Sequence, residues 1–161
     1  MGWQDKIPWT IIRDEAGRVD IDPKLVAAII AVESGGDPYS MRYEPNFRFR
    51  LMPYKFAKIN GITEETENIL QSSSFGLMQI MGTVCRELGF QKSLLMLVEP
   101  DLNIELGCKK LSQLFLKHQD TSDVIASYNA GSVRFEKDGS YKNQFYVNKV
   151  LQRMKELDEK K

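Results

Sequence analysis

Apolar positions along most of this chain recur with the period of an α-helix. Between residues 103 and 118 they return every three or four positions, which predicts an amphipathic helix. The same spacing predicts a last helix over residues 143–157. The apolar residues that set these two patterns are Ile104, Cys108, Leu111 and Phe115 in the first helix, and Phe145, Val147, Val150, Leu151 and Met154 in the second.

An earlier segment, Leu25 to Val32, is apolar on nearly every side, which is typical of a central, buried helix. Asp22 followed by Pro23 is a helix-start signal, and the Gly35-Gly36 pair is a stop signal. Shorter elements are predicted as helices over residues 83–88 and 122–130 and as a turn over residues 93–98.

Strand-like alternation is weak throughout. The one candidate runs from Tyr43 to Leu51, where Phe47 and Phe49 alternate with arginines and Pro45 interrupts the pattern. We therefore predict an all-α single domain over residues 1–161, with a short β-like or irregular insertion at about residues 41–74.

Composition and charge narrow the classes of function. The chain has 22 basic and 22 acidic residues, so it lacks the positive charge that a nucleic-acid-coating protein needs. Its longest apolar run is far too short to cross a bilayer, and its first residues do not form a signal-peptide pattern. We expect no nucleic-acid partner, no membrane insertion and a monomer.

Histidine and cysteine chemistry is limited. A Ser-His-Asp or Cys-His centre would have to use His118, the single histidine, which falls at the polar end of a predicted helix. Zinc-dependent hydrolases usually need two or three histidines, so no metal site is predicted. We expect Cys85 and Cys108 to be buried thiols.

Glu33 lies in the last turn of the most apolar helix. Apolar surroundings and the negative end of a helix both disfavour a charged carboxylate, so we expect a raised pKa for this group. A carboxylic acid that stays protonated near neutral pH can protonate the leaving oxygen of a glycosidic bond. The alternative is a solvated glutamate at a helix end.

Two further sequence tracts contain candidate ligand-binding residues. The run from Ser72 to Met81 (SSSFGLMQIM) combines small residues, which allow close approach of a ligand, with the amide of Gln79 and the apolar Met78 and Met81. Its alternative interpretation is a loop with two core methionines. The second tract, Tyr128 to Gly131 (YNAG), places a phenol beside an amide at a helix end.

In this order, the Glu33 to Gly36 (ESGG), Gly76 to Gln79 (GLMQ) and Tyr128 to Gly131 (YNAG) motifs, followed by Tyr146-Val147, resemble the soluble lytic transglycosylase (SLT) domain. The resemblance runs from about Ile21 to Leu151 and implies a lysozyme-like helical fold. Residues 41–47 and the acidic run of residues 64–67 are similar to a subgroup found in phage and prophage genes.

The resemblance implies an enzyme that acts on peptidoglycan glycan strands without a metal or an organic cofactor. One glutamate, at the position of Glu33, would protonate the oxygen between N-acetylmuramic acid and N-acetylglucosamine and then act as a base. The muramyl 6-hydroxyl would then attack its own anomeric carbon and form a 1,6-anhydro end. Supporting or binding roles would fall to Ser34, Ser72 or Ser74, Met78, Gln79, Tyr128, Asn129 and Tyr146.

The stretch between Gly35 and Ser74 is longer than in typical members of this family, and it keeps an alternative open. If a second carboxylate in it held a water molecule, the enzyme would be a hydrolase similar to goose-type lysozyme. The candidates for that carboxylate are Glu44, Glu64, Glu65 and Glu67. The part from Met41 to Lys58 has five basic residues against one acidic residue, a local charge of +4 that would attract the carboxylates of the wall polymer, or form a solvated face.

A different class is a non-catalytic wall-binding or virion structural module that keeps the groove. The intact Glu33 argues against it, because binding alone gains nothing from an acid of raised pKa. For the enzyme we expect action in the periplasm or cell wall. Without a signal peptide in this chain, we expect release by a phage or prophage route, a place in a virion, or removal of a leader.

Overall fold

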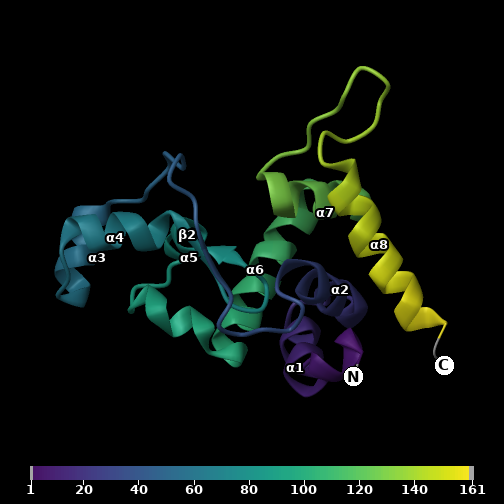
Figure 1. Cartoon of the computed structure of the whole chain (residues 1–161), viewed down its shortest axis with the longest axis horizontal. Coiled ribbons are helices and arrows are strands. Elements are labelled where there is room, and N and C mark those ends of the chain that lie inside the picture. Colours follow the sequence, from purple (N-terminus) through teal and green to yellow (C-terminus); the bar gives the residue numbers. More distant parts are fainter. Residues whose placement is uncertain (1, 160–161) are drawn as a thin grey trace.

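The structure is a computed structural model that describes residues 2–159. It is mostly helical with one small sheet (Figure 1), so the all-α prediction is confirmed. In chain order the elements are the 3₁₀ helix η1 (Trp3–Lys6), α1 (Trp9–Arg18), α2 (Pro23–Glu33), β1 (Met41–Tyr43), α3 (Pro53–Asn60), α4 (Glu64–Gln71), β2 (Ser73–Phe75), β3 (Ile80–Met81), α5 (Gly82–Glu87), the 3₁₀ helix η2 (Leu94–Val98), α6 (Pro100–Lys117), α7 (Thr121–Ala130) and α8 (Gln144–Asp158).

Helix α2 is the buried helix that the sequence predicts. The Asp22 carboxylate accepts a hydrogen bond from the backbone N–H of Lys24 at 2.9 Å, and Pro23 occupies the first turn. Every residue from Leu25 to Ile30 is buried, against α1 on one side and α8 on another. This packing fixes the direction in which the last turn of α2, and with it Glu33, leaves the core.

The strands of the sheet are formed by residues other than the alternating segment at 43–51 that the sequence offered as a strand. Strands β1, β2 and β3 pair antiparallel in that order, with Met41 opposite Phe75 and Ser74 opposite Met81. The strand predicted from Tyr43 to Leu51 is therefore wrong, because only Tyr43 belongs to a strand. Pro45 has no N–H to donate, and the backbone of Leu51 bonds to the side chain of Gln71 instead of a strand, at 2.7 and 3.0 Å.

The insertion at residues 41–74 contains strand β1, most of β2 and irregular segments, as predicted, and also two helices, α3 and α4, that the sequence analysis did not predict. Thr63 caps α4 by accepting from the N–H of Thr66 at 3.1 Å, and three glutamates occupy the first turn of that helix. Helix α3 begins with Pro53 and ends at Asn60, followed by Gly61, whose φ is +65°. Helix α1 was also missed.

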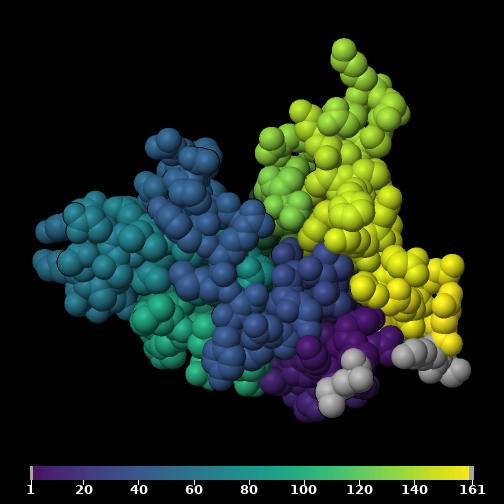
Figure 2. Space-filling model, in the orientation of Figure 1, coloured from purple at the N-terminus to yellow at the C-terminus, as the bar shows by residue number. Residues whose placement is uncertain are grey.

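Helix α6 runs through the middle of the molecule and separates two sides (Figure 1). Helices α3, α4 and α5 lie on one side and α7 and α8 on the other, with α1 packed against α6, and α2 packed against α1 and α8. The space-filling view shows a hollow between the segment after β1 and the end of α7 (Figure 2). Among residues 2–159, no helix is both long and apolar enough to span a bilayer.

Both cysteines are buried free thiols, as the sequence analysis predicts. Cys85 lies in α5 and Cys108 in α6, and burial raises the pKa of each thiol to about 12. At neutral pH they are protonated and pack as small apolar side chains.

Candidate active site

The hollow is a cavity of about 710 Å³ that is open to solvent. Its walls come from the end of α2, from β1 and the segment after it, from the β2–β3 hairpin, from α5 and α6, and from the end of α7. Its volume falls in the range of small-ligand sites in proteins. The cavity therefore unites segments that are far apart in the sequence.

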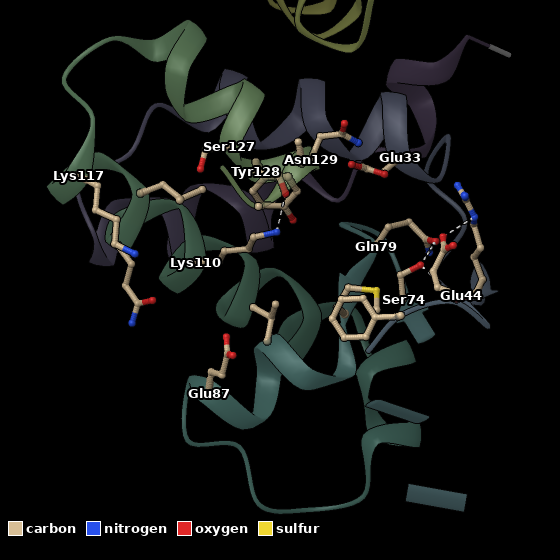
Figure 3. A pocket seen from close by; sticks show the side chains of 18 of the residues that line it. Glu33, Glu44, Ser74, Gln79, Glu87, Lys110, Lys117, Ser127, Tyr128 and Asn129 are labelled. Atoms are coloured by element: carbon tan, nitrogen blue, oxygen red, sulfur yellow. Dashed lines mark hydrogen bonds and ion pairs between the residues drawn. The ribbon is translucent and has the colours of Figure 1, made fainter. Parts of the chain in front are cut away.

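Glu33 lies in the wall of this cavity, at the last turn of α2 (Figure 3). The hydroxyl of Tyr146, from the first turn of α8, donates a hydrogen bond to Glu33 Oε1 at 2.6 Å. Burial raises the pKa of Glu33, and the Tyr146 hydrogen bond, Lys110 and Arg42 act in the opposite direction. The burial effect is the larger, so the pKa is raised, as the sequence predicts.

Ser34 joins the ESGG motif to the GLMQ motif. Its hydroxyl donates to the carbonyl oxygen of Leu77 at 2.8 Å and accepts from the N–H of Gly36 at 3.2 Å. The side chain thus holds the turn after Glu33 against the hairpin rather than forming part of the cavity wall. Its place supports a positioning role.

The GLMQ motif forms the turn of the β2–β3 hairpin. Gly76 has a φ of +71°, and a Cβ there would lie 2.4 Å from Nδ2 of Asn103, so only glycine fits. Gln79 Nε2 donates to the carbonyl oxygens of Ser40 and Gly76, each at 2.9 Å, and Ser74 Oγ donates to Gln79 Oε1 at 3.0 Å. Gln79 and Ser74 both lie in the cavity wall (Figure 3).

The sequence left Ser72 and Ser74 as alternatives, and the structure separates them. Ser72 is buried outside the cavity, where it accepts a hydrogen bond from Arg50 Nε at 3.0 Å.

Met78 also departs from the prediction, because its side chain is fully buried in the core against Gly107. Met78 is not among the residues that line the cavity, whereas Met81 is.

Tyr128 and Asn129 are brought to the cavity by the end of α7. The buried Tyr128 hydroxyl donates to the carbonyl oxygen of Met78 at 2.8 Å, which ties α7 to the hairpin. Asn129 is exposed, and its Oδ1 accepts from Asn143 Nδ2 at 3.0 Å. The cavity therefore brings together Glu33, Ser74, Gln79, Tyr128 and Asn129.

Lys110 of α6 is a cavity residue that the sequence analysis missed. Its ammonium lies 3.8 Å from the centre of the Tyr128 ring and donates to the Tyr128 carbonyl oxygen at 2.7 Å. Burial lowers its pKa to about 8, although Glu33 acts to raise it. No local signal distinguishes this lysine from its neighbour Lys109, since both stand beside apolar positions of one helix.

Of the four glutamates that the sequence offered as a second carboxylate, only Glu44 lines the cavity. Glu44 lines the cavity and pairs with Arg42 at 2.7 Å, whereas Glu64 and Glu65 are exposed on α4 away from it. Glu67 is fully buried against Arg86, with two hydrogen bonds of 2.8 and 3.0 Å. Glu87, which the sequence analysis did not name, also lines the cavity.

Metal-ligating side chains do not gather in the part of the chain that the structure describes. No three His, Cys, Asp or Glu side chains of residues 2–159 lie close enough together to hold a metal ion. The polar groups that line the cavity are carboxyl, phenol, amide, hydroxyl, ammonium and guanidinium groups.

Known proteins resemble this chain in fold and in sequence. The structure is similar to the X-ray structure of an inactive mutant of the lytic transglycosylase Slt from Pseudomonas aeruginosa, with a TM-score of 0.59 and 21% identity. The likeness covers 92% of this chain but only 24% of that chain, and at this identity it concerns the fold alone. A family model described as the transglycosylase SLT domain matches residues 10–150. Because this match spans most of the sequence, the chain belongs to the transglycosylase SLT domain family.

Proposed function

We propose that this protein cleaves the β-1,4 bond between N-acetylmuramic acid and N-acetylglucosamine in peptidoglycan and leaves 1,6-anhydro-muramyl ends. Glu33 is the general acid and then the general base. The observation that carries the proposal is the position of Glu33 in the cavity wall, with a raised pKa and a hydrogen bond from Tyr146. Membership of the SLT family supports the choice of substrate.

The first step needs a protonated carboxyl group. Burial favours that form of Glu33, and the Tyr146 hydroxyl occupies Oε1, which leaves Oε2 to carry the proton toward the glycosidic oxygen. When the bond breaks, the proton moves from Oε2 to the leaving oxygen. The carboxylate that remains is stabilised by the Tyr146 hydrogen bond and by the positive charges of Lys110 and Arg42.

The second step uses the same carboxylate as a base. Glu33 takes the proton of the muramyl 6-hydroxyl while that oxygen bonds to the anomeric carbon of the same sugar. The attack is intramolecular, so no second carboxylate is needed to hold a water molecule. Gln79, Ser74, Tyr128 and Asn129 surround the position where the sugars would lie.

Hydrolysis, as in goose-type lysozyme, is the second candidate. The observation that favours it is the presence of Glu44 and Glu87 in the same cavity as Glu33. Either carboxylate would have to hold a water molecule on the opposite face of the sugar. One oxygen of Glu44 is already paired with Arg42 at 2.7 Å, whereas transglycosylation needs no second carboxylate, and for this reason we place transglycosylation first.

The deciding experiment is mass spectrometry of the muropeptides released from purified peptidoglycan. An anhydro product is lighter than the hydrolytic product by one water molecule. Anhydro-muramyl ends would support the proposal, and reducing ends would make the protein a lysozyme. Retention on sacculi without release of soluble fragments would instead favour a non-catalytic wall-binding or virion module.

Because peptidoglycan is the proposed substrate, we also propose that the reaction takes place in the periplasm or cell wall. A phage or prophage origin is part of the same proposal.

A further inference from the structure

One face of α6 forms an arm of the cavity, of which the proposed reaction uses only the charge of Lys110. Lys110, Gln113, Leu114 and Lys117 follow one another at positions i, i+3, i+4 and i+7, so they share one helix face, and all of them line the cavity. Figure 3 shows Lys117 and Glu87 on the side away from Gln79, Ser74 and Glu44, with Lys110 between the two groups. We name Lys110, Gln113, Lys117 and Glu87 the α6 arm.

The polar groups of this arm are available for a ligand. Within residues 2–159, the side chains of Gln113 and Lys117 are exposed and make no hydrogen bond or ion pair. Lys110 makes one hydrogen bond, to the Tyr128 carbonyl oxygen, and an ammonium group has three donors. The arm therefore offers unused N–H donors from two cations and one amide.

Another lysine of α6 shows the contrast. Lys109, which does not line the cavity, pairs with Glu105 at 2.5 Å across one helical turn. The residue at the corresponding position before Lys117 is the neutral Gln113. Lys117, which faces the cavity, thus lacks a carboxylate one helical turn before it, whereas Lys109 has one in Glu105.

The arm carries both signs of charge. Glu87 of α5 lines it opposite the lysines, and its charge acts on Lys110. Two cations and one carboxylate give a net charge of +1. The glycan of peptidoglycan is an uncharged chain of N-acetylated sugars, so sugars alone would gain little from these groups, whereas the peptide stems carry several carboxylates and a free amine.

We propose that the α6 arm binds the peptide stem on a muramyl residue next to the cleaved bond. Lys110 and Lys117 receive stem carboxylates, Gln113 hydrogen-bonds the stem backbone, and Glu87 receives the stem amine. The proposal rests on the proposed function, because it assigns the peptide part of the same substrate. Each carboxylate contact is a charge-assisted hydrogen bond, which is stronger than a neutral one.

The test compares intact peptidoglycan with peptidoglycan whose stem carboxylates have been amidated chemically. The enzymes are the wild type, Lys117→Gln and the matched control Lys109→Gln, an exposed lysine of α6 that does not line the cavity. We expect Lys117→Gln to lower kcat/KM about tenfold relative to the wild type on intact peptidoglycan, and to match the wild type on the amidated substrate. The wild type and Lys109→Gln should each lose at least about tenfold when the carboxylates are amidated, because Lys110 and Lys117 both lose their partners.

Three results would overturn the proposal. The first is a wild-type rate that does not differ between the two substrates. The second is a loss by Lys117→Gln, relative to the wild type, that is as large on amidated as on intact peptidoglycan. The third is a loss by Lys109→Gln on intact peptidoglycan that equals the loss by Lys117→Gln. In each of these cases the enzyme still releases fragments, so the proposed function stands. Absence of any released fragment from both substrates with the wild type would instead contradict the proposed function, and the assignment of the arm would fall with it.

Discussion

At Glu33, burial and a hydrogen bond act on the pKa in opposite directions. Burial in the wall of the cavity raises it, and the Tyr146 hydroxyl, at 2.6 Å, lowers it. In the proposed mechanism, this balance would keep a proton available for the leaving oxygen without holding it too tightly. The position of Glu33 at the end of an apolar helix predicted the first effect, but nothing near it in the sequence indicates Tyr146 as its partner.

Replacing Glu33 by Gln should reduce kcat by a factor of about 10² to 10⁴, because the amide can neither give nor take the proton. Tyr128→Phe should cost less, since the Tyr128 hydroxyl is bonded to the Met78 carbonyl and not to Glu33. Initial rates on labelled peptidoglycan measure both. Substantial remaining activity in Glu33→Gln would remove Glu33 from its proposed role.

Glu33→Gln should be at least as stable as the wild type, and the difference in stability between the two proteins should depend on pH. The pKa of Glu33 is 4.5 in the unfolded chain and higher in the folded protein. Below pH 4.5 the carboxyl group is protonated in both states and does not affect stability. Between the two pKa values it ionises more readily in the unfolded chain, so the free energy of unfolding falls as the pH rises. The stability gain of Glu33→Gln over the wild type should therefore grow with pH across that interval. Urea unfolding at a series of pH values measures it, and a gain that shrinks with pH would contradict the assignment.

Tyr146→Phe should move the alkaline limb of the kcat/KM profile to higher pH. Without the phenol, the charged form of Glu33 loses a hydrogen bond, so its pKa rises further and the protonated acid persists to higher pH. Tyr141→Phe is the matched control, because the Tyr141 hydroxyl bonds Asp123 outside the cavity. A limb that stays in place, or moves in both variants, would show that Tyr146 does not act on the acid.

At the scale of elements, the β2–β3 hairpin depends on one buried side chain of α6. Asn103 Nδ2 donates to the carbonyl oxygens of Phe75 and Leu97, and Asn103 Oδ1 accepts from the N–H of Met78, each at 2.8 Å. Asn103 is fully buried, so these three bonds replace all contact with water. The GLMQ motif is readable in the sequence, but the side chain that holds it is not.

Asn103→Leu should lower the free energy of unfolding by at least about 3 kcal/mol, because three buried backbone groups lose their partner. Asn148→Leu, at an exposed position of α8, should change it by less than about 0.5 kcal/mol. Urea denaturation of both variants checks this. Equal effects would mean that water or a shifted backbone replaces the three bonds.

Over the whole molecule, the two sides of the cavity are stabilised differently. On the α3–α5 side, the buried Arg86 bonds Glu67 with two hydrogen bonds, donates to the carbonyl oxygens of Phe90 and Lys92, and stacks 4.4 Å from Phe56. On the other side, α2, α7 and α8 pack mainly through apolar side chains. One cavity wall thus depends on a buried ion pair.

Arg86→Met should destabilise the protein by about 3–5 kcal/mol, because it leaves the Glu67 carboxylate buried without a partner. The double variant Glu67→Leu/Arg86→Met should recover part of that loss, since no unpaired charge remains. Chemical denaturation of the two single variants and the double variant gives the coupling energy. Additive losses would show that the pair contributes through packing rather than charge.

What the sequence by itself determined are the features that depend on neighbouring residues. The start of α2 at Asp22-Pro23, the end of α7 at Gly131 and the helical period of α6 follow from caps and side-chain spacing within a few positions. The ordered motifs around Glu33 also identified the family. Even for α4, which was missed, Thr63 and the glutamates that follow it were readable signals.

Only the tertiary structure decided which side chains reach the cavity. It placed Ser74 rather than Ser72 in the wall, put the Met78 side chain in the core, and brought Lys110 and Glu44 beside the site. The physical reason is distance along the chain: Tyr146 and Glu33 bond across 113 positions, and Met78 and Asn103 across 25. Such contacts depend on how α2, α6 and α8 pack, and no local pattern specifies that packing.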